Sequence, residues 1–223
     1  MKIVRINDYR EYKLTDSEVI KRILAGEKEL YEVLMRRHNQ KLYRVVRSYV
    51  KSDEEIQDLM QDTYLKAYEK LYQFKHDALF STWLVRIGIN ESLAMLRTKG
   101  RQAHLFEQTG KHTDVIALEI PDAEQPNPER KMIRQEAKYL LEKAIDALEE
   151  KYRLVYILKE VEGMSLPEIS VCLDVTPGNV KVRLHRARLM IKEGLYELSQ
   201  QTDVFEFGSR RCDVLVDNMM QRI

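Results

Sequence analysis

Apolar residues recur every three or four positions along most of the chain, and this helical period limits the fold more than any other feature. Between 27 and 50 the stripe includes Leu30, Leu34 and Val45, and it repeats after Ser52-Asp53 and again after Phe80. The sequence of 223 residues has only 8 Gly and 5 Pro, which disfavours a turn-rich β fold. We therefore predict an all-α protein. The expected helices cover 15–26, 27–50, a segment starting at 52–53, 80–100, a segment starting at 128, 152–161, and two helices within 165–191.

The helical period stops between His104 and Glu129. This segment carries six acidic residues against one lysine, together with three prolines and no apolar period. Such a composition is typical of a linker rather than of a folded domain. The sequence thus predicts two small helical domains joined by an acidic flexible linker.

Charge and cysteine content exclude several classes of protein. Lys+Arg is 37 and Asp+Glu is 36, a net charge of +1, so any site for a polyanion must come from local segregation of charge. Cys172 and Cys212 lie far apart without metal-ligand spacing, so we expect no metal and no cofactor. The N-terminus has no signal-peptide pattern, and no apolar run is long enough to span a membrane, which fits a cytoplasmic protein. Because GxxxxGK[ST], GxGxxG, HExxH and GxSxG are all absent, we do not expect an enzyme.

The strongest local motif is a helix-turn-helix over 165–191. Ser165 and Glu168 have the spacing of a capping box, which starts the first helix. Three residues, Asp174-Val175-Thr176, form the expected turn, and Thr176-Pro177 has the composition of a second helix start.

The second helix of this motif divides into two faces on a helical wheel. Val180, Leu184, Ala187 and Ile191 fall on one side, and Lys181, Val182, His185 and Arg186 fall on the other. Between 176 and 192 there are five Lys/Arg and no acid. The simplest alternative is a solvated basic face. Together with the capping box and short turn, however, the pattern predicts a helix that enters the major groove of DNA.

Two segments of the chain are similar to a known family. Residues 148–195, including SLPEISVCLDVTPGNVKVRLHRARL, resemble region 4 of an extracytoplasmic-function (ECF) sigma factor of the sigma-70 family, and residues 53–101, including DLMQD and FKHDALFSTW, resemble region 2. The resemblance implies a subunit that directs RNA polymerase to promoters in stress-responsive transcription. The implied layout is an N-terminal helix in 1–26, region 2 in 27–101, a linker in 102–131, region 4 in 132–199 and a C-terminal extension in 200–223. A dimeric helix-turn-helix regulator is the alternative, but it accounts for neither DLMQD nor FKHDALFSTW.

In the family, region 2 binds RNA polymerase core at the β′ clamp helices. The resemblance places this contact on Asp58, Leu59, Gln61, Asp62 and Leu65. Four of the five lie at i, i+3, i+4 and i+7, which is one helix face. Solvated acids beside core leucines are the alternative. Further partners implied are the β flap, promoter DNA and an anti-sigma factor.

Region 2 also implies capture of the melted −10 strand, and region 4 implies recognition of the −35 duplex. For the −10 strand the expected residues are Phe80, Trp83, Arg86 and Asn90, with Arg97, Lys99 and Arg101 on phosphates. Phe80 and Trp83 also have core spacing, so packing is the alternative for both. For the −35 element the expected residues are Thr176, Pro177, Asn179, Lys181, Val182, Arg183, His185, Arg186 and Arg188.

The chain departs from the family pattern at two places. Ser170 and Asp174 stand where the helix-turn-helix ordinarily has a small residue and a glycine, and Asp tolerates the left-handed conformation less well than Gly. The extension over 200–223 exceeds a minimal two-domain plan. Leu215, Met219 and Ile223 there are spaced for a short amphipathic helix that covers region 4 or binds a regulator.

Overall fold

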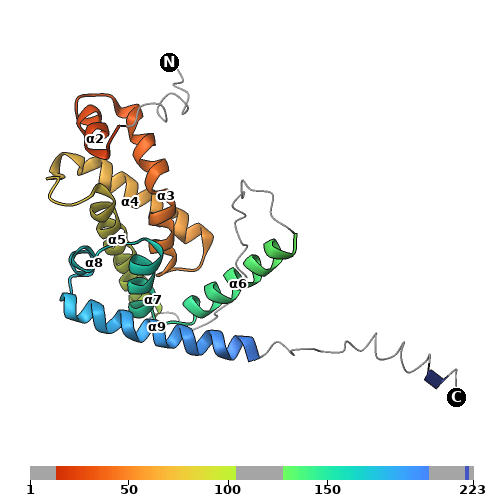
Figure 1. The fold of residues 1–223 in the computed structure, drawn as a ribbon. Helices are drawn as coiled ribbons and strands as arrows, with labels where there is room; N and C mark the ends of the chain where they lie inside the picture. Colours follow the sequence, from red (N-terminus) through yellow and green to blue (C-terminus); the bar gives the residue numbers. More distant parts are fainter. Residues whose placement is uncertain (1–13, 104–127, 201–218, 221–223) are drawn as a thin grey trace.

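A computed structural model describes residues 14–103, 128–200 and 219–220, and every regular element of this part is helical (Figure 1). The all-α prediction is therefore confirmed. The elements are α2 (Asp16–Leu24), η1 (Lys28–Leu30), α3 (Tyr31–Arg47), α4 (Asp53–Glu69), η2 (Leu71–Gln73), α5 (Phe80–Ala103), α6 (Pro128–Asp146), α7 (Glu150–Tyr156), η3 (Ile157–Val161), α8 (Leu166–Leu173) and α9 (Pro177–Gln200).

Local chemistry explains where the first helices begin and end. The Thr15 hydroxyl accepts a hydrogen bond from the Glu18 amide at 3.3 Å, and the Glu18 carboxylate accepts one from the Thr15 amide at 2.7 Å. This capping box starts α2, and Gly26, with φ +114°, allows the turn after it. Ser52 occupies the N-cap position of α4, but its hydroxyl caps no amide. The acidic residues of the first turn instead complement the positive end of that helix.

Helices α2 to α5 form the first module, which packs α3, α4 and α5 side by side. Leu34, Leu42 and Leu84 are fully buried at its centre. Gly88 of α5 lets two helices approach closely, because a Cβ there would lie only 2.7 Å from Leu42 Cδ1.

Helices α6 to α9 form the second module. In the helix-turn-helix, α8 packs against η3 and α9 packs against α7. Helix α6 also packs against α9 (Figure 1). The helix expected over 152–161 begins at Glu150 and widens to π geometry in η3, and Gly163, with φ +68°, follows its end. Ala144, Leu148 and Ala187 belong to the core that joins α6 to α9.

Much of the expected linker and tail lies outside the described residues. Helix α5 continues to Ala103 and α6 starts at Pro128, so the acidic segment between them is not described. The expectations for Cys212, Leu215 and Ile223 also fall outside the described part.

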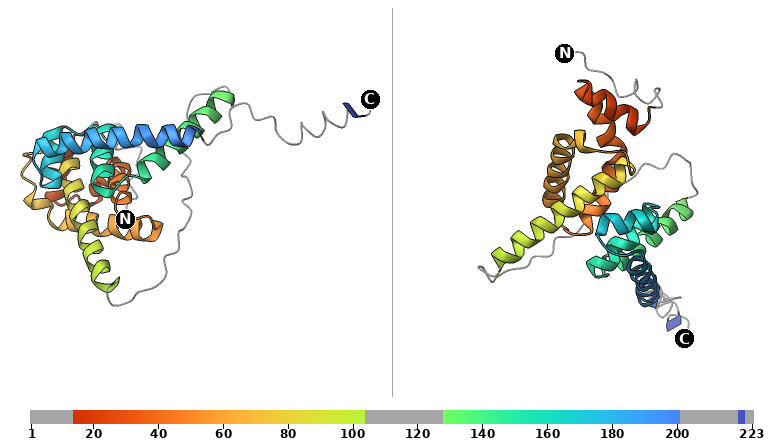
Figure 2. Two further views of the ribbon diagram at one scale, coloured as in Figure 1. Left: turned by 90° about the horizontal axis from the view of Figure 1, so that it is seen from below. Right: turned by 90° about the vertical axis from the view of Figure 1, so that its left-hand side faces the viewer.

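The two modules pack directly against each other, which the sequence did not predict. Val45 of α3 and Val85 and Ile89 of α5 share one buried cluster with Val155 and Ile169 of the second module. Helix α8 contacts α5 and η3 contacts α3, and the second module lies beside the first in both views of Figure 2. None of the described helices has the length and apolar character needed to cross a membrane.

Candidate nucleic-acid interface

The helix-turn-helix has the predicted boundaries. The Ser165 hydroxyl and the Glu168 carboxylate form the expected capping box, with the Ser165 amide 2.8 Å from Glu168 Oε2. Helix α8 ends at Leu173, and Asp174 adopts the left-handed conformation with φ 53° and ψ 47°. The Thr176 hydroxyl then accepts a hydrogen bond from the Asn179 amide at 3.3 Å, which starts α9.

Ser170, at the position where the family ordinarily has a small residue, stabilises this turn. Its hydroxyl donates a hydrogen bond to the Val175 carbonyl, and its own carbonyl accepts one from the Val175 amide. The side chain therefore ties the end of α8 to the turn before α9.

Helix α9 has the two faces that the wheel predicted. Val180, Leu184, Ala187 and Ile191 are buried, at 0 to 6% exposure. The opposite face is open to solvent, and Val182 there is 52% exposed although it is apolar. Eight of the nine expected −35 residues are exposed, and only Arg183 is half-buried; the eight are Thr176, Pro177, Asn179, Lys181, Val182, His185, Arg186 and Arg188.

Two arginines of α9 are held by neighbours in the same module. Arg186 donates a hydrogen bond to the Tyr152 hydroxyl at 3.3 Å. Arg188 pairs with Glu160 at 2.6 Å. Because both residues are still exposed, these contacts orient the side chains without burying them.

At the start of α5 the aromatic residues form a cluster. The Phe80 ring centroid lies 5.8 Å from those of Phe74 and Trp83, and Phe80 is only 2% exposed. The Phe80 ring therefore fills the core, as the packing alternative expects, and a contact of Phe80 with the −10 strand stays a prediction. Trp83 is half-buried in the same cluster.

The polar residues expected at the −10 strand lie outside this cluster. Arg86, Asn90, Arg97 and Lys99 are exposed along α5. Lys99 forms an ion pair with Glu55 of α4. The side chain of Arg101 lies outside the described part.

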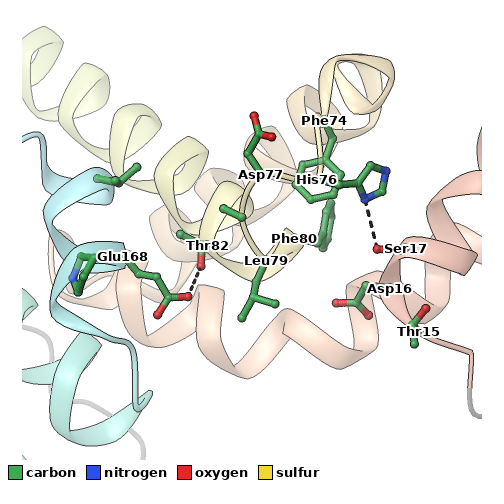
Figure 3. Close-up of a pocket in the computed structure, with 13 residues that line it drawn as sticks. Thr15, Asp16, Ser17, Phe74, His76, Asp77, Leu79, Phe80, Thr82 and Glu168 are labelled. Carbon is green, nitrogen blue, oxygen red and sulfur yellow. Dashed lines mark hydrogen bonds between the residues drawn. The ribbon is translucent and has the colours of Figure 1, made fainter.

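A cavity of about 680 Å³ opens beside the aromatic cluster (Figure 3). One wall is the loop that carries His76, Asp77 and Leu79, and a second is the start of α2. The His76 ring lies 3.2 Å from the Ser17 hydroxyl across it. The third wall comes from the second module. Its residues are Pro167, Glu168 and Val171 of α8.

The sequence did not predict the walls that α2 and α8 supply. No local pattern could indicate them, because they lie far along the chain from the loop and reach it only through tertiary packing.

Helix α4 presents an acidic face. Asp58, Gln61, Asp62 and Leu65 are exposed together, and Leu65 is 62% exposed despite its apolar side chain. Leu59 is 3% exposed and belongs to the core, as the alternative reading of the leucines expects, and its contact with a partner stays a prediction. The helix has six acidic residues and one lysine.

A groove of about 400 Å³ continues this face toward α3. Gln61 and Leu65 line it together with three tyrosines, Tyr31, Tyr64 and Tyr68. The Tyr31 hydroxyl donates to the Tyr64 carbonyl at 2.7 Å, and burial raises the pKa of Tyr31 well above its ordinary value. Sequence reasoning missed this groove, although Tyr64 and Tyr68 have i, i+4 spacing.

Each of the two modules matches a known protein family. The family described as Sigma-70 region 2 matches residues 34–102, and Sigma-70, region 4, matches residues 138–191. The ECF RNA polymerase sigma-E factors of Salmonella typhimurium and Escherichia coli K12 are 31% identical over 183 residues, which is 79% of this chain and 92% of theirs. The chain belongs to the ECF sigma factors of the sigma-70 family. The RNA polymerase sigma-H factor of Pseudomonas aeruginosa is 29% identical over 186 residues, 83% of this chain and 96% of its own.

Solved structures share the fold of this sigma factor. The sigma factor RpoE of Bartonella quintana, crystallised with the anti-sigma factor NepR, has a TM-score of 0.59 at 22% identity, covering 78% of this chain and 98% of its own. CnrH, solved with the cytosolic domain of CnrY, has a TM-score of 0.53 at 23% identity, covering 80% and 96%. Membership of the family makes the chain a DNA-binding transcription initiation factor rather than an enzyme.

Proposed function

We propose that this sigma factor holds RNA polymerase core through α4, reads the −35 duplex through α9 and receives the melted −10 strand along α5. The observation that carries the proposal is the division of α9 into a buried apolar face and an exposed basic face. A helix fixed by one face presents the other as a rigid reading surface, which is what entry into a major groove of about 12 Å requires.

On α9 the proposed roles follow from position. Lys181 and Arg186 lie on the outward face, where their donors reach guanine edges. Arg183 and Arg188 flank that face and serve phosphates. The Glu160 carboxylate beside Arg188 sets the direction of its guanidinium.

On α5 the exposed polar residues are proposed to contact the bases of the −10 strand. The aromatic residues hold these polar residues in place by packing in the core. Asn90 is exposed and offers a paired donor and acceptor to an unpaired base. The cavity beside Phe74 is large enough for an extruded base, and His76 and Asp77 supply polar contacts in its wall. Phe80 and Trp83 support this wall from the core side.

The acidic face of α4 is the proposed contact with the β′ clamp helices. Asp58 and Asp62 attract basic side chains, and the groove beside Leu65 receives an apolar one, so the fitting partner is a basic amphipathic helix. Region 4 is the proposed partner of the β flap. An anti-sigma factor is a further proposed partner, since both similar structures were solved in complexes, and the proposed location is the cytoplasm.

A retention assay tests the polymerase contact. The double variant Asp58→Ala/Asp62→Ala should lose retention by immobilised core polymerase, because it removes two charges from one face. Glu193→Ala/Glu197→Ala makes the same charge change on exposed residues of α9 and should be retained like the natural chain. Equal retention of both variants would contradict the proposed α4 contact.

A further inference from the structure

The loop between η2 and α5 holds one residue in a strained backbone conformation. His76 has a φ of 60°, in the left-handed region that residues other than glycine rarely adopt. In the part of the chain that the structure describes, Asp174 is the other such residue, and it ends a helix, where this conformation is common. His76 ends no helix and instead lies in the wall of the cavity beside Phe74 (Figure 3). Strain of this kind persists only where surrounding contacts hold it.

Two contacts hold the His76 side chain. Its ring packs edge-on against the ring of Phe74, with centroids 4.6 Å apart. The Nδ1 atom of the ring is hydrogen-bonded to the Ser17 hydroxyl at 3.2 Å, as the dashed line in Figure 3 shows. Phe74 is a near neighbour in sequence, whereas Ser17 lies 59 residues away, in the first turn of α2. The bond to Ser17 therefore ties the loop to another element of the first module.

Helix α2 is a firm support for this bond. Val19, one turn or less from Ser17, is fully buried in the core of the first module. The Asp16 carboxylate, next to Ser17, accepts hydrogen bonds from Arg37 and His38 of α3, each at 2.9 Å. The first turn of α2 is thus fixed both by packing and by ion pairs, so the Ser17 hydroxyl has a defined position.

The loop itself has little packing of its own. His76, Asp77 and Leu79 are exposed, and Leu79 is 66% exposed although it is apolar. Without the bond to Ser17, the left-handed conformation of His76 would have less to hold it, and the loop would sample other conformations. A base binds more tightly to a cavity that is already formed than to one whose wall must first be ordered.

We infer that Ser17 is a positioning residue for base capture: through His76 it holds the loop of residues 74–79 in the conformation that shapes the cavity. The first turn of α2 then takes part in recognition of the −10 strand. This inference rests on the proposed function, because it names a further residue behind the same cavity. Ser17 and His76 both belong to the first module, so the contact does not depend on where the second module lies.

Binding of single-stranded DNA to polymerase reconstituted with the full-length chain tests the inference. The probe is the −10 strand of a promoter selected by run-off transcription, with copies that lack one base at each position in turn. For the natural chain, the loss of affinity should be largest at the position whose base is extruded. Ser17→Ala should reduce that loss by about fivefold, the size expected for one hydrogen bond, and leave the losses at other positions unchanged.

Three further variants separate positioning from a merely structural role. Ser17→Thr keeps a hydroxyl and should keep the natural loss. Ser52→Ala makes the same change as Ser17→Ala at a hydroxyl that caps no amide, and it should behave like the natural chain. His76→Gly accepts the left-handed conformation without strain but removes the ring. Adding Ser17→Ala to His76→Gly should cause no further change, because Ser17 acts through that ring. Circular dichroism checks that each variant folds.

The possible failures are distinct. The inference is wrong, and the proposed function stands, if Ser17→Ala keeps the natural loss, weakens the intact strand and every copy equally, or behaves like Ser17→Thr. A further effect of Ser17→Ala in the His76→Gly chain would also contradict it. If removal of a base cost the natural chain no affinity at any position, the proposed base capture would be wrong, and the inference would fall with it.

Discussion

Helices α5 and α9 are both 24 residues long, and both carry basic residues proposed to meet DNA, but they differ in what covers them. Helix α9 packs within its own module and leaves its basic face open. Helix α5 packs on α3, α4 and α8. Its aromatic residues therefore serve the core, and only residues such as Arg86 and Asn90 stay exposed. A reading surface can be predicted from a helical wheel only where a single face of the helix is covered.

Replacement of Phe80 should give the largest effect, and it tests whether the start of α5 is core or reading surface. Phe80→Ala removes a buried ring and should lower the free energy of unfolding by about 3–5 kcal/mol, measured by chemical denaturation. Tyr72→Ala, at a tyrosine that is 70% exposed, should change it by less than about 0.5 kcal/mol. If the Phe80→Ala protein kept its stability and lost only its binding to the −10 strand, Phe80 would be a contact residue and not a core residue.

Two substitutions on α9 separate base reading from phosphate contact. Lys181→Ala should weaken binding by about 1–3 kcal/mol at one base pair of the −35 element and relax the preference there. Arg188→Ala should weaken binding to all DNA sequences equally. It should also reduce the slope of the logarithm of the affinity against the logarithm of the salt concentration by about one. Titrations of a duplex library at several salt concentrations measure both. If the two variants changed sequence preference and salt dependence in the same way, the proposed orientation of α9 on DNA would be wrong.

Acid should loosen the contact between the modules. Burial alone raises the pKa of Asp146, but hydrogen bonds from Arg47 and Lys51 outweigh it and hold that pKa below its ordinary value. Arg153 of α7 adds a positive charge nearby, while Glu142 adds a negative one beside Arg47. The contribution of the carboxylate is therefore complete at neutral pH and is lost as pH falls through the lowered pKa.

Small-angle scattering over an acid titration, with circular dichroism to confirm that the helices persist, measures this opening. Asp146→Asn should remove the part of the transition that depends on this carboxylate. An unchanged transition in Asp146→Asn would show that another group controls it.

The smallest effect is expected at Asp174. Its φ of 53° is a conformation that glycine adopts without strain, so Asp174→Gly should raise the free energy of unfolding by no more than about 1 kcal/mol. The gain is limited because glycine also increases the freedom of the unfolded chain. Thermal unfolding measures the change, and a large destabilisation would mean that the Asp174 side chain makes a contact that matters.

Local signals predicted the parts of the fold that depend on neighbours in sequence. The capping boxes at Thr15 and Ser165, the three-residue turn and the faces of α9 all follow from residue types at fixed spacing, and the structure confirms each. The residues of the α4 face came from the family resemblance. Asp58, Gln61, Asp62 and Leu65 are exposed there, whereas Leu59 is buried, because an apolar position is equally compatible with core and interface.

Contacts between distant segments could not be predicted. The bond from Cys172 to Thr82 and the three bonds to Asp146 join residues of different modules, and no periodicity carries that information. The same reason explains why spacing alone left Phe80 open between core and strand contact, since its burial depends on how α5 packs among its neighbours. The groove between Tyr31 and Tyr68 was missed because it forms only when α3 and α4 pack.

Run-off transcription with purified core polymerase and a promoter library tests the central claim most directly. We predict transcripts that start at defined positions only when this chain is added, and that depend on both a −35 and a −10 element. Transcription that is the same with and without the chain, or that needs only one of the two elements, would contradict the account.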